Sequence, residues 1–530
     1  MRRWLRYVFL ITLTLSLSCQ EEEKETGMVK VPAGSPAVFK THLPRPFFEK
    51  SGYLSEIYWI SWNLLDNNVR AGTPGNGFSR TYLDEGFNEY IYQWDTCFMV
   101  MFAIYGHGAF PAMESLDNFY ARQRRDGWIC RVYHEGNGEP AEMPGVEEPM
   151  INPPLFAWAE WKYYLLSGDN SRFIRILPVL DAYYRWIDGN CRGEGKAQSF
   201  YYNTHLGSGM DDSPRFDIEQ GGWVDLSCQM ALFAKFMMFI ARETGEERLF
   251  AAYQQRYNEL VRLINSMMWD EGEGFYYDLD RNGRKQKVKT GASFWSLISE
   301  TATFPQARKM AEHLSNPDEF YRPHLFPSLS ADHPEYDREG HYWRGGVWAP
   351  LNYMIIKGLD MYPLREIAAM AAMNHVNNIY DVYANFRPDS NRIIPSERDV
   401  DYRTIWECYS PDFSRPATRW DGTYYCRQDF VGWTGLGPVA LLLENIIGLQ
   451  PSAPEDELYW NLRLQEKHGV ENYRFGDNRA DIICESNDLP AGEALIRILS
   501  DSPFRLVISS RIGRSDFDIV AGENRFVLML

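Results

Sequence analysis

The sequence predicts a mainly α-helical protein in which paired helices form a toroid, followed by a small β-sandwich-like domain. Amphipathic helical segments recur in pairs from about residue 46 to residue 450, and the loops between the pairs are rich in Gly, Trp, Asp and Pro. After residue 450 the pattern changes to short β-type runs. Together these observations indicate a helical toroid whose functional loops gather at one end.

The helical pairs are clearest between residues 154 and 268. PPLFAWAEWKYYLLSG is followed by DNSRFIRILPVLDAYYRWIDG, whose apolar stripe consists of Phe173, Ile176, Leu177, Leu180, Tyr184 and Ile187. In LFAAYQQRYNELVRLINSMMW the apolar face consists of Tyr253, Tyr257, Leu260, Ile264 and Met267. Short breaks join the helices of each pair, so we expect antiparallel hairpins in series over residues 46–450.

The C-terminal part has a different pattern. PSAPEDE, from residue 451, is typical of a linker, and RADIICE, ALIRILS, FRLVISS, FDIVAG and RFVLML are short β-type runs with turn signals between them. We therefore predict a small β-sandwich-like domain over residues 455–530, packed on the helical domain.

The first residues have the build of a secretory signal. Three arginines precede an apolar run from Tyr7 to Leu17 that is too short to span a membrane. The end of this run resembles the lipobox of bacterial lipoproteins, with Cys19 as the lipidated residue, although Ser16 stands where Leu or Val is usual. The acidic QEEEKETG that follows is typical of a disordered tether.

These features predict the targeting of the chain. We expect a signal peptide over residues 1–18, a lipidated acidic tether and lead-in over residues 19–45, and export to a bacterial cell envelope, periplasmic or at the surface. The protein would be anchored to the membrane through acyl chains on Cys19. Beyond the leader, no stretch approaches the roughly 20 apolar residues of a spanning helix.

Charge and cysteine content exclude several functions. The formal net charge is −18, and removing residues 1–18 with their three arginines makes it about −21. Such an acidic chain lacks the basic patches that nucleic-acid binding needs. Seven scattered cysteines remain after Cys19 without a CxxC motif, and the ten histidines show no metal-ligand spacing. We expect no metal site, no cofactor and a monomer. The cysteine pattern does not decide whether one or two disulfides form.

The loop GSGMDDSPRFD, residues 207–217, is the first candidate for chemistry. Gly207, Gly209 and Pro214 place its aspartates on a turn between elements. An Asx-rich turn that caps the next helix is the alternative interpretation. No Ser or Cys stands in a nucleophile motif, so any catalysis falls to carboxylates.

Further inter-helix stretches combine acids, aromatic residues and Gly. They are YIYQWDTCF (90–98), RRDGWICR (124–131), HYWRGGVWAPLNY (341–353), TIWECYSPD (404–412) and FVGWTGLGP (430–438). Trp and Tyr faces stack on the C–H face of a pyranose, while Asp, Arg and Gln bind its hydroxyls. This shared chemistry favours a sugar site.

These motifs resemble those of glycoside hydrolase family 63. GSGMDDSPRFD is similar to that family's ESGMDNSPR signature, YWRGGVWAPLNY to its YWRGPVW and NGWAPLQ segments, and WECYSPD with GWTGL to its Glu-x-Tyr and Phe-Gly-Trp motifs. QWDT, RDGWI and NPP follow in the expected order, so the resemblance spans about residues 90 to 440. It also extends to the trehalases.

The resemblance implies an (α/α)6 barrel and an inverting exo-α-glycosidase that acts on a glucose- or mannose-type sugar. Asp211 matches the family's general acid and Glu407 its general base. Inversion needs one protonated carboxyl for the leaving oxygen and a second to activate water, roughly 6.5–9.5 Å apart. The positions expected to line the pocket and bind the substrate are Trp94, Asp95, Trp343, Arg344 and Trp433.

The signature also departs from the family. Gly207 replaces the family's Glu and Asp212 its Asn, which puts the usual glucose or mannose preference in doubt. Two other functions stay open: a polysaccharide lyase on a helical toroid, which would need a Tyr/His or Arg cluster to neutralise a uronate, and a non-catalytic glycan-binding lipoprotein.

A calcium loop is not expected at DLDRNGRK. Its acids have the spacing of such a loop, but the twelfth position is Lys289, where a bidentate Glu is required. We interpret this segment as the turn of a β-hairpin.

Overall fold

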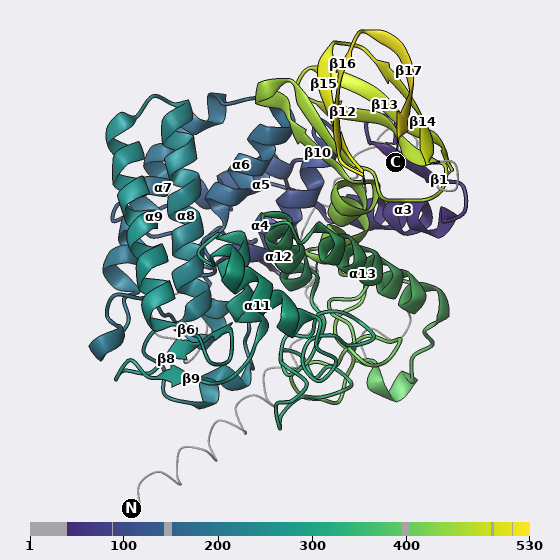
Figure 1. Cartoon of the computed structure of the whole chain (residues 1–530). Coiled ribbons are helices and arrows are strands. Elements are labelled where there is room, and N and C mark those ends of the chain that lie inside the picture. The colour runs from purple at the N-terminus through teal and green to yellow at the C-terminus, as the bar shows by residue number, and fades with distance from the viewer. Residues whose placement is uncertain are drawn as a thin grey trace, which may run out of the picture.

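The computed structural model of the 530-residue chain describes residues 40–86, 88–141, 151–394, 402–488, 492–510 and 512–529. The signal peptide, Cys19 and the acidic tether therefore lie outside the described residues. Figure 1 shows a helical domain with a β-sandwich at one end.

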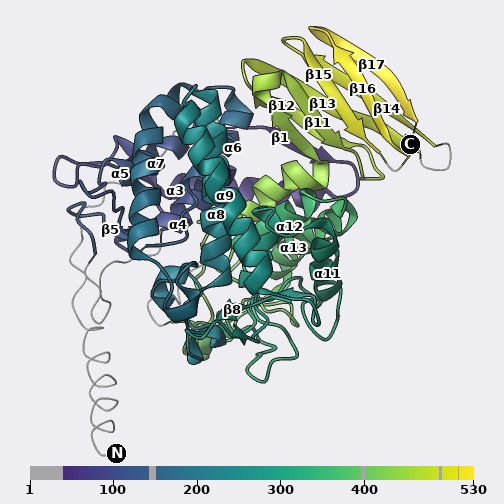
Figure 2. The same ribbon diagram turned by 60° about the vertical axis from the view of Figure 1, so that its left-hand side comes forward.

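An inner and an outer ring of helices build the helical domain, which Figures 1 and 2 show from the side. The inner ring consists of α4 (Gln93–Ala103), α6 (Phe156–Ser167), α8 (Val224–Glu243), α10 (Trp295–Ile298), α12 (Ala349–Asp360) and the π-helix η9 (Gly437–Ile447). The outer ring consists of α5 (Ala112–Tyr120), α7 (Ser171–Asn190), α9 (Glu247–Met267), α11 (Phe304–Leu314), α13 (Arg365–Asn385) and α3 (Gly52–Asn67). Inner and outer helices alternate along the chain, and η9 closes the ring by packing on α3 and α13. This is the expected (α/α)6 barrel.

Burial separates the two rings. All eleven residues of α4 are buried, whereas α9 buries Tyr253, Leu260 and Ile264 of its 21 residues. The six predicted stripe residues of α7 are all buried. An amphipathic helix with one apolar stripe therefore lies outside, and a helix that is apolar all round lies inside.

Helix α8 is the one helix in the described part of the chain whose length and hydropathy would suffice to cross a membrane. Our expectation that no stretch beyond the leader comes near this criterion was wrong. However, 89% of its apolar window is buried inside the protein. Its apolar character is that of an inner-ring helix.

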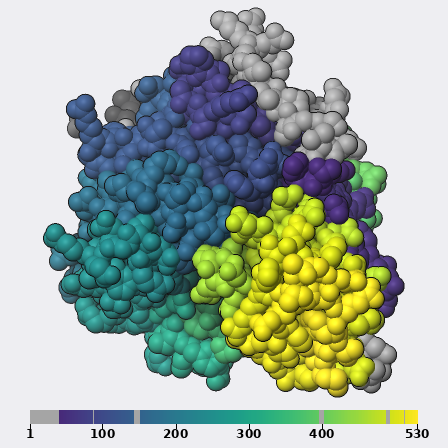
Figure 3. Space-filling view, turned by 90° about the horizontal axis from the view of Figure 1, so that it is seen from above, coloured from purple at the N-terminus to yellow at the C-terminus, as the bar shows by residue number. Residues whose placement is uncertain are grey.

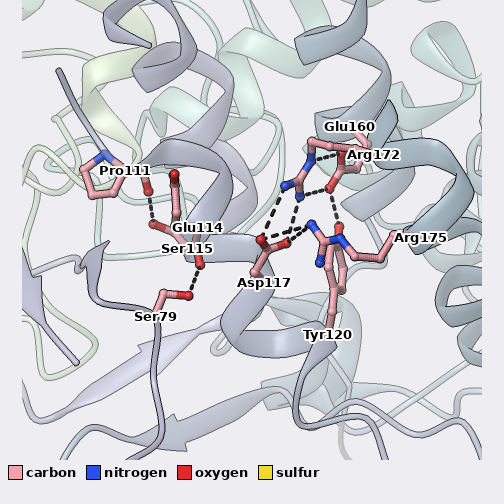
Figure 4. Close-up of polar contacts among 9 residues, drawn as sticks. All are labelled: Ser79, Pro111, Glu114, Ser115, Asp117, Tyr120, Glu160, Arg172 and Arg175. Atoms are coloured by element: carbon pink, nitrogen blue, oxygen red, sulfur yellow. Dashed lines mark hydrogen bonds and ion pairs between the residues drawn. The ribbon is translucent and has the colours of Figure 1, made fainter. Parts of the chain in front are cut away.

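An ion-pair network ties three helices together on the side of the barrel (Figure 4). Arg172 of α7 contacts Glu160 of α6 at 2.7 Å and Asp117 of α5 at 2.9 Å. The Tyr120 hydroxyl donates to Glu160 at 3.1 Å. Glu160 is fully buried, so removing Arg172 would leave an uncompensated charge, which typically costs about 3–5 kcal/mol.

Two sheets, in which most strand pairs are antiparallel, form the C-terminal sandwich. The first has the order β1 (Arg45–Phe48), β12 (His468–Phe475), β13 (Asn478–Asp488), β14 (Glu493–Ser500) and β17 (Gly522–Met529), and the second β10 (Leu449–Ser452), β11 (Glu457–Asn461), β15 (Phe504–Ser509) and β16 (Arg514–Ile519). Residues 451–457, which we expected to be a linker, instead belong to β10, a 3-10 turn and the start of β11. The N-terminal strand β1 also belongs to the sandwich, with Arg45 opposite Glu471.

The sandwich contacts the barrel at the C-terminal ends of inner helices. The Gly476 amide donates to the carbonyl of Leu166 at the end of α6, and the Trp460 indole donates to Ile447 at the end of η9. Figure 3 looks down on this end, with the yellow sandwich on one side and the blue and teal helices on the other. The opposite end of the barrel, where the inner helices begin, is not covered by the sandwich.

Four short two-stranded antiparallel sheets lie outside the sandwich. They pair β2 (Val69–Ala71) with β3 (Thr81–Leu83), β4 (Tyr90–Tyr92) with β5 (Val132–His134), β6 (Trp269–Asp270) with β7 (Phe275–Tyr276), and β8 (Asp278–Leu279) with β9 (Lys285–Gln286). The last pair confirms the predicted hairpin at DLDRNGRK, where Asp280 accepts the amides of Asn282 and Arg284 at 2.8 Å.

Candidate active site

The candidate motifs meet at the N-terminal end of the inner helices. Asp95 lies in the first turn of α4, and the loop of residues 207–217 precedes α8. HYWRGGVW precedes α12, and the segment from Trp406 to Trp433 precedes η9. Because each of these motifs lies at or just before the start of an inner helix, residues more than 300 positions apart in the sequence meet at one end of the barrel.

A pocket of about 580 Å³ lies among these loops. It is lined by Tyr92, Trp94, Asp95, Arg131, Asn152, Leu206, Gly209, Asp211, Tyr342, Trp343, Glu407, Trp420, Arg427 and Trp433. Both predicted catalytic carboxylates and four of the five predicted binding residues therefore share one cavity.

Glu407 is held by hydrogen bonds to both carboxylate oxygens. The Tyr342 hydroxyl donates to Oε1 at 3.3 Å, and the Arg427 amide donates to Oε2 at 3.2 Å. The Arg427 guanidinium lies 3.8 Å from Oε2. The side chain is buried, and its backbone carbonyl accepts the Trp433 indole N–H at 3.0 Å. Two hydrogen-bond donors and a guanidinium therefore hold the Glu407 carboxylate in place within the pocket.

The environment of Asp211 differs from that of Glu407. Burial raises the pKa of its carboxyl to about 6, Arg131 opposes this rise, and the charges of Asp212 and Glu407 add to it. A carboxyl that keeps its proton to about pH 6 suits a general acid. The two carboxyls of the pocket are thus differentiated by their surroundings.

Asp95 forms the third acidic group of the pocket. Burial raises the pKa of its carboxyl well above the usual range, and the charges of Glu407 and Asp211 act in the same direction, while Arg131 opposes them. Asp95 is 3% exposed, and it lines the cavity together with Arg131. A buried acid in this position can bind a sugar hydroxyl.

The inner wall of the pocket is a tryptophan cluster. Trp94 lies 6.2 Å from Trp343 and 6.0 Å from Trp433, measured between ring centroids. Behind them Trp348 stacks on Trp343 at 4.0 Å with an interplanar angle of 1°. Because these rings pack on one another, the cluster gives the pocket a rigid floor.

Arg344 is the predicted binding residue that does not line the pocket. Its guanidinium lies 3.6 Å from Asp212 and 3.5 Å from Asp217, and it also contacts Glu335. The Asp212 carboxylate accepts the Trp343 amide at 2.9 Å. Arg344 is therefore directed toward carboxylates beside the pocket, where it holds the acid loop against the loop before α12.

Close packing fixes the conformation of the acid loop. A Cβ on Gly207 would lie 2.6 Å from the Ile151 carbonyl, which leaves no room for the family's Glu in this conformation. Gly209 has φ +77°, and a Cβ there would lie 2.4 Å from the Trp94 ring. The sequence interpretation as a turn is confirmed, and the turn presses directly on the pocket floor.

A buried triad anchors the same loop. The Arg215 guanidinium binds Asp225 at 2.7 and 2.8 Å and forms an ion pair with Asp278 at 2.9 Å. Asp278 also accepts the Val224 amide at the start of α8 at 2.7 Å. Arg215, four residues after Asp211, therefore fixes the acid loop to the barrel.

Several residues that line the pocket were not among the predicted site residues. Arg131 and Asn152 lie in or beside stretches that were singled out, RRDGWICR and NPP, and Tyr342 directly precedes Trp343. Arg427 and Trp420 belong to a loop without a recognised motif. Among the described residues there is no group of three or more His, Cys, Asp or Glu arranged to hold a metal ion.

A larger pocket, of about 900 Å³, lies at the opposite end of the barrel. Its one lining carboxylate, Glu444, accepts the hydroxyls of Tyr105 and Tyr353 and forms ion pairs with Lys162 and Lys357. These lysines hold the pKa of Glu444 below its usual range despite burial. With its one carboxylate fully paired, this cavity lacks the acid and base of a hydrolase.

The comparisons with known sequences identify the family. Residues 88–426 match the model of the mannosylglycerate hydrolase MGH1-like glycoside hydrolase domain. An uncharacterized protein of Borreliella burgdorferi is 30% identical over 436 residues, covering 82% of this chain and 86% of that protein. The mannosyl-oligosaccharide glucosidase of Saccharomyces cerevisiae is 22% identical over 436 residues, covering 68% of this chain, and the chain spans 50% of that enzyme's length.

The solved structures support the fold. The family 63 mannosylglycerate hydrolase of Thermus thermophilus, in complex with Tris and D-glycerate, matches with a TM-score of 0.55 and 17% identity over 72% of this chain and 98% of that one. The matching architecture confirms the (α/α)6 barrel. Because the family model covers more than half of the sequence and includes both Asp211 and Glu407, the chain belongs to the mannosylglycerate hydrolase MGH1-like glycoside hydrolases, as its resemblance to family 63 implies.

Proposed function

We propose that the protein is an inverting exo-α-glycosidase that removes an α-linked glucose- or mannose-type sugar, with Asp211 as general acid and Glu407 as general base. The observation that carries this proposal is the contrast between two carboxyls in one pocket. The pKa of Asp211 is raised to about 6, whereas Glu407 accepts hydrogen bonds at both oxygens beside an arginine.

The proposed reaction is a single displacement. Glu407 accepts a proton from a water molecule as the water oxygen attacks the anomeric carbon. The glycosidic C–O bond breaks, and Asp211 donates its proton to the departing oxygen. The products are a sugar of inverted configuration and the free alcohol of the leaving group, and Asp211 and Glu407 then exchange protons with water.

The pocket supports exo action and the sugar class. Its floor is the buried tryptophan cluster, so one terminal sugar ring fits against Trp94, Trp343 and Trp433, with Asp95 as a partner for its hydroxyls. The names of the relatives, a mannosylglycerate hydrolase and a mannosyl-oligosaccharide glucosidase, support a mannose or glucose type of sugar.

The test is the anomeric form of the first product. Purified protein is incubated with α-linked glucose and mannose disaccharides and followed by proton NMR, beside Asp211→Asn and Glu407→Gln. The exposed Asp217, in the same loop, provides the control variant Asp217→Asn. We expect the β-anomer first, and rates at least about 100-fold lower in the two site variants.

Other products would contradict the proposal. An α-anomer formed first would indicate retention, and an unsaturated uronate product from acidic polysaccharides would indicate a lyase, whose reaction the Arg131, Arg427 and Tyr342 side chains could serve. Glycan binding without turnover would favour the non-catalytic alternative.

We also propose that the protein is exported and anchored to a bacterial envelope through lipid on Cys19, and acts as a monomer. The support is the signal-like leader and the acidic stretch after Cys19. Mass spectrometry of the membrane-extracted protein should find acyl chains on Cys19 and none in Cys19→Ala. Membrane-extracted wild-type protein without acyl chains on Cys19 would contradict lipidation as the anchor.

A further inference from the structure

The mouth of the active-site pocket carries one aromatic residue that differs from the rest. Trp94, Trp343 and Trp433 are 7%, 1% and 6% exposed, and they pack on one another. Trp420 lines the same pocket but is 52% exposed, which makes it the most exposed of the described lining residues. It therefore marks the solvent end of the cavity.

The backbone holds Trp420 at the tip of a tight hairpin. The Arg419 amide donates to the Tyr424 carbonyl at 2.9 Å, and Gly422 takes the turn at φ +66°. The Asp421 carboxylate accepts the amides of Thr423 and Tyr424 at 2.7 and 3.1 Å. The exposure of Trp420 thus belongs to an ordered turn.

The hairpin is joined to the segment that carries Tyr342. The carbonyl of Trp420 lies 2.6 Å from the His341 ring nitrogen Nε2, and the Tyr342 amide donates to the Thr418 carbonyl at 3.1 Å. The rings of Tyr342 and Trp420 meet edge to face, with centroids 5.8 Å apart. Since Tyr342 also donates to Glu407, the indole is fixed relative to the general base.

The indole ring keeps a large exposed apolar surface. The Arg419 guanidinium lies 5.9 Å from its centroid, and the described aromatic ring beside it is that of Tyr342. An ordered, half-exposed indole beside a polar cavity is a typical ligand contact, because a large rigid ring binds with little loss of conformational entropy.

We infer that Trp420 is the platform of a subsite for the leaving group, and that this leaving group contains a sugar ring. The inference rests on the proposed function. When the terminal sugar lies on the tryptophan floor, its glycosidic oxygen points to the mouth, so the leaving group meets Trp420. A pyranose offers a C–H face to the indole, whereas a three-carbon acid such as glycerate has no ring face to stack.

The experiment compares two substrates that differ in the leaving group. An α-glycosyl fluoride releases a single atom and uses no leaving-group subsite, whereas an α-linked disaccharide of the same sugar releases a ring. For Trp420→Ala we expect the ratio of kcat/KM for the disaccharide to that for the fluoride to fall about 3- to 10-fold, the size of one aromatic contact. Trp420→Phe should retain most of the wild-type ratio.

The control is Phe413→Ala. Phe413 is also exposed, at 40%, and lies on the same segment, but it does not line the pocket, so its removal should leave the ratio unchanged. Equal losses on both substrates in Trp420→Ala, or an unchanged ratio, would overturn the subsite. Wild-type protein that hydrolyses neither substrate would instead overturn the proposed function, and the subsite with it.

Discussion

Glu407 and Arg427 contact each other through both backbone and side chain. The Glu407 amide donates to the Arg427 carbonyl at 2.8 Å, the Arg427 amide donates to the Glu407 carboxylate at 3.2 Å, and the guanidinium lies 3.8 Å from the same oxygen. The position of the proposed base is therefore set by an adjacent chain segment as well as by its own.

Replacing the Arg427 side chain should raise the pKa of Asp211 and remove a contact that positions Glu407. The positive charge of Arg427 lowers the pKa of Asp211, so Arg427→Met should raise that pKa above about 6 and move the alkaline limb of the kcat/KM profile upward. We expect kcat to fall on the order of tenfold, equivalent to about 1.4 kcal/mol. Arg427→Lys, which keeps the charge, should keep the limb near its wild-type position, and a limb unmoved in Arg427→Met would contradict the assignment.

The pH profile of the wild-type enzyme should reflect the raised pKa of Asp211. The acid must be protonated to act, so kcat/KM should decline above about pH 6, approaching a tenfold loss per pH unit. Initial rates on a disaccharide between about pH 4 and about pH 9 test this. A plateau that extends beyond about pH 8 would show that Asp211 is not the acid.

The same pKa shift predicts that Asp211 lowers stability at alkaline pH. The carboxyl binds its proton more tightly in the folded protein than in the unfolded chain, with pKa values of about 6 and 3.8, so folding stability is lost as pH rises through this window. Asp211→Asn should therefore be more stable than wild type at about pH 8, by up to about 3 kcal/mol, with a much smaller difference at about pH 4. Urea unfolding at both pH values tests this, with Asp217→Asn as the control.

The Arg215 triad should be essential for stability. Arg215 is 1% exposed, and Arg215→Met would leave Asp225 and Asp278 as buried carboxylates without their cation. We expect a loss of about 3–5 kcal/mol in the free energy of unfolding. Arg281→Met is the matched control, because Arg281 pairs with Glu194 on the surface, where an ion pair contributes about 0–1 kcal/mol. Similar losses in the two variants would contradict the role of the triad.

Gly209 should tolerate no side chain without loss of activity. A methyl group there would displace the Trp94 ring from the pocket floor, and misplacement by about 1 Å can cost about 100-fold in rate. Gly245 has a similar φ, +74°, but a Cβ there would meet nothing within 4 Å. Gly245→Ala therefore carries the same backbone strain without the contact, and its kcat/KM should stay close to wild type while that of Gly209→Ala falls.

The sequence predicts the fold well where periodicity is strong. The stripes of α7 and α9 identify outer helices, and the alternation of β14 identifies a strand with one buried face. The four-residue α10 and the π-helix η9 have too little periodic signal for such a prediction. Strand β1 has no local signal at all, because its partner lies more than 400 residues away.

The residues of the site also divide into those that the sequence predicts and those that it does not. The motifs that resemble those of the family contain Asp211, Glu407 and the floor tryptophans. These motifs lie at or before the starts of inner helices, so the fold brings the residues into one pocket. Arg427 and Trp420 belong to an irregular loop. Hydrogen bonds to other segments set the position of this loop, and the sequence does not reveal those hydrogen bonds. Arg344 stands in a recognised motif, yet three nearby carboxylates direct it away from the cavity.

The pairing of β1 with β12 constrains how the chain reaches its final structure. Arg45–Phe48 finds its partner only after residues 468–471 have been synthesised, and α3 meets η9 only after residue 437. Such contacts between distant segments form slowly, since a large loop must close before any of them is gained. During synthesis, strand β1 therefore cannot pair and the ring of helices cannot close at η9 until these C-terminal residues have emerged.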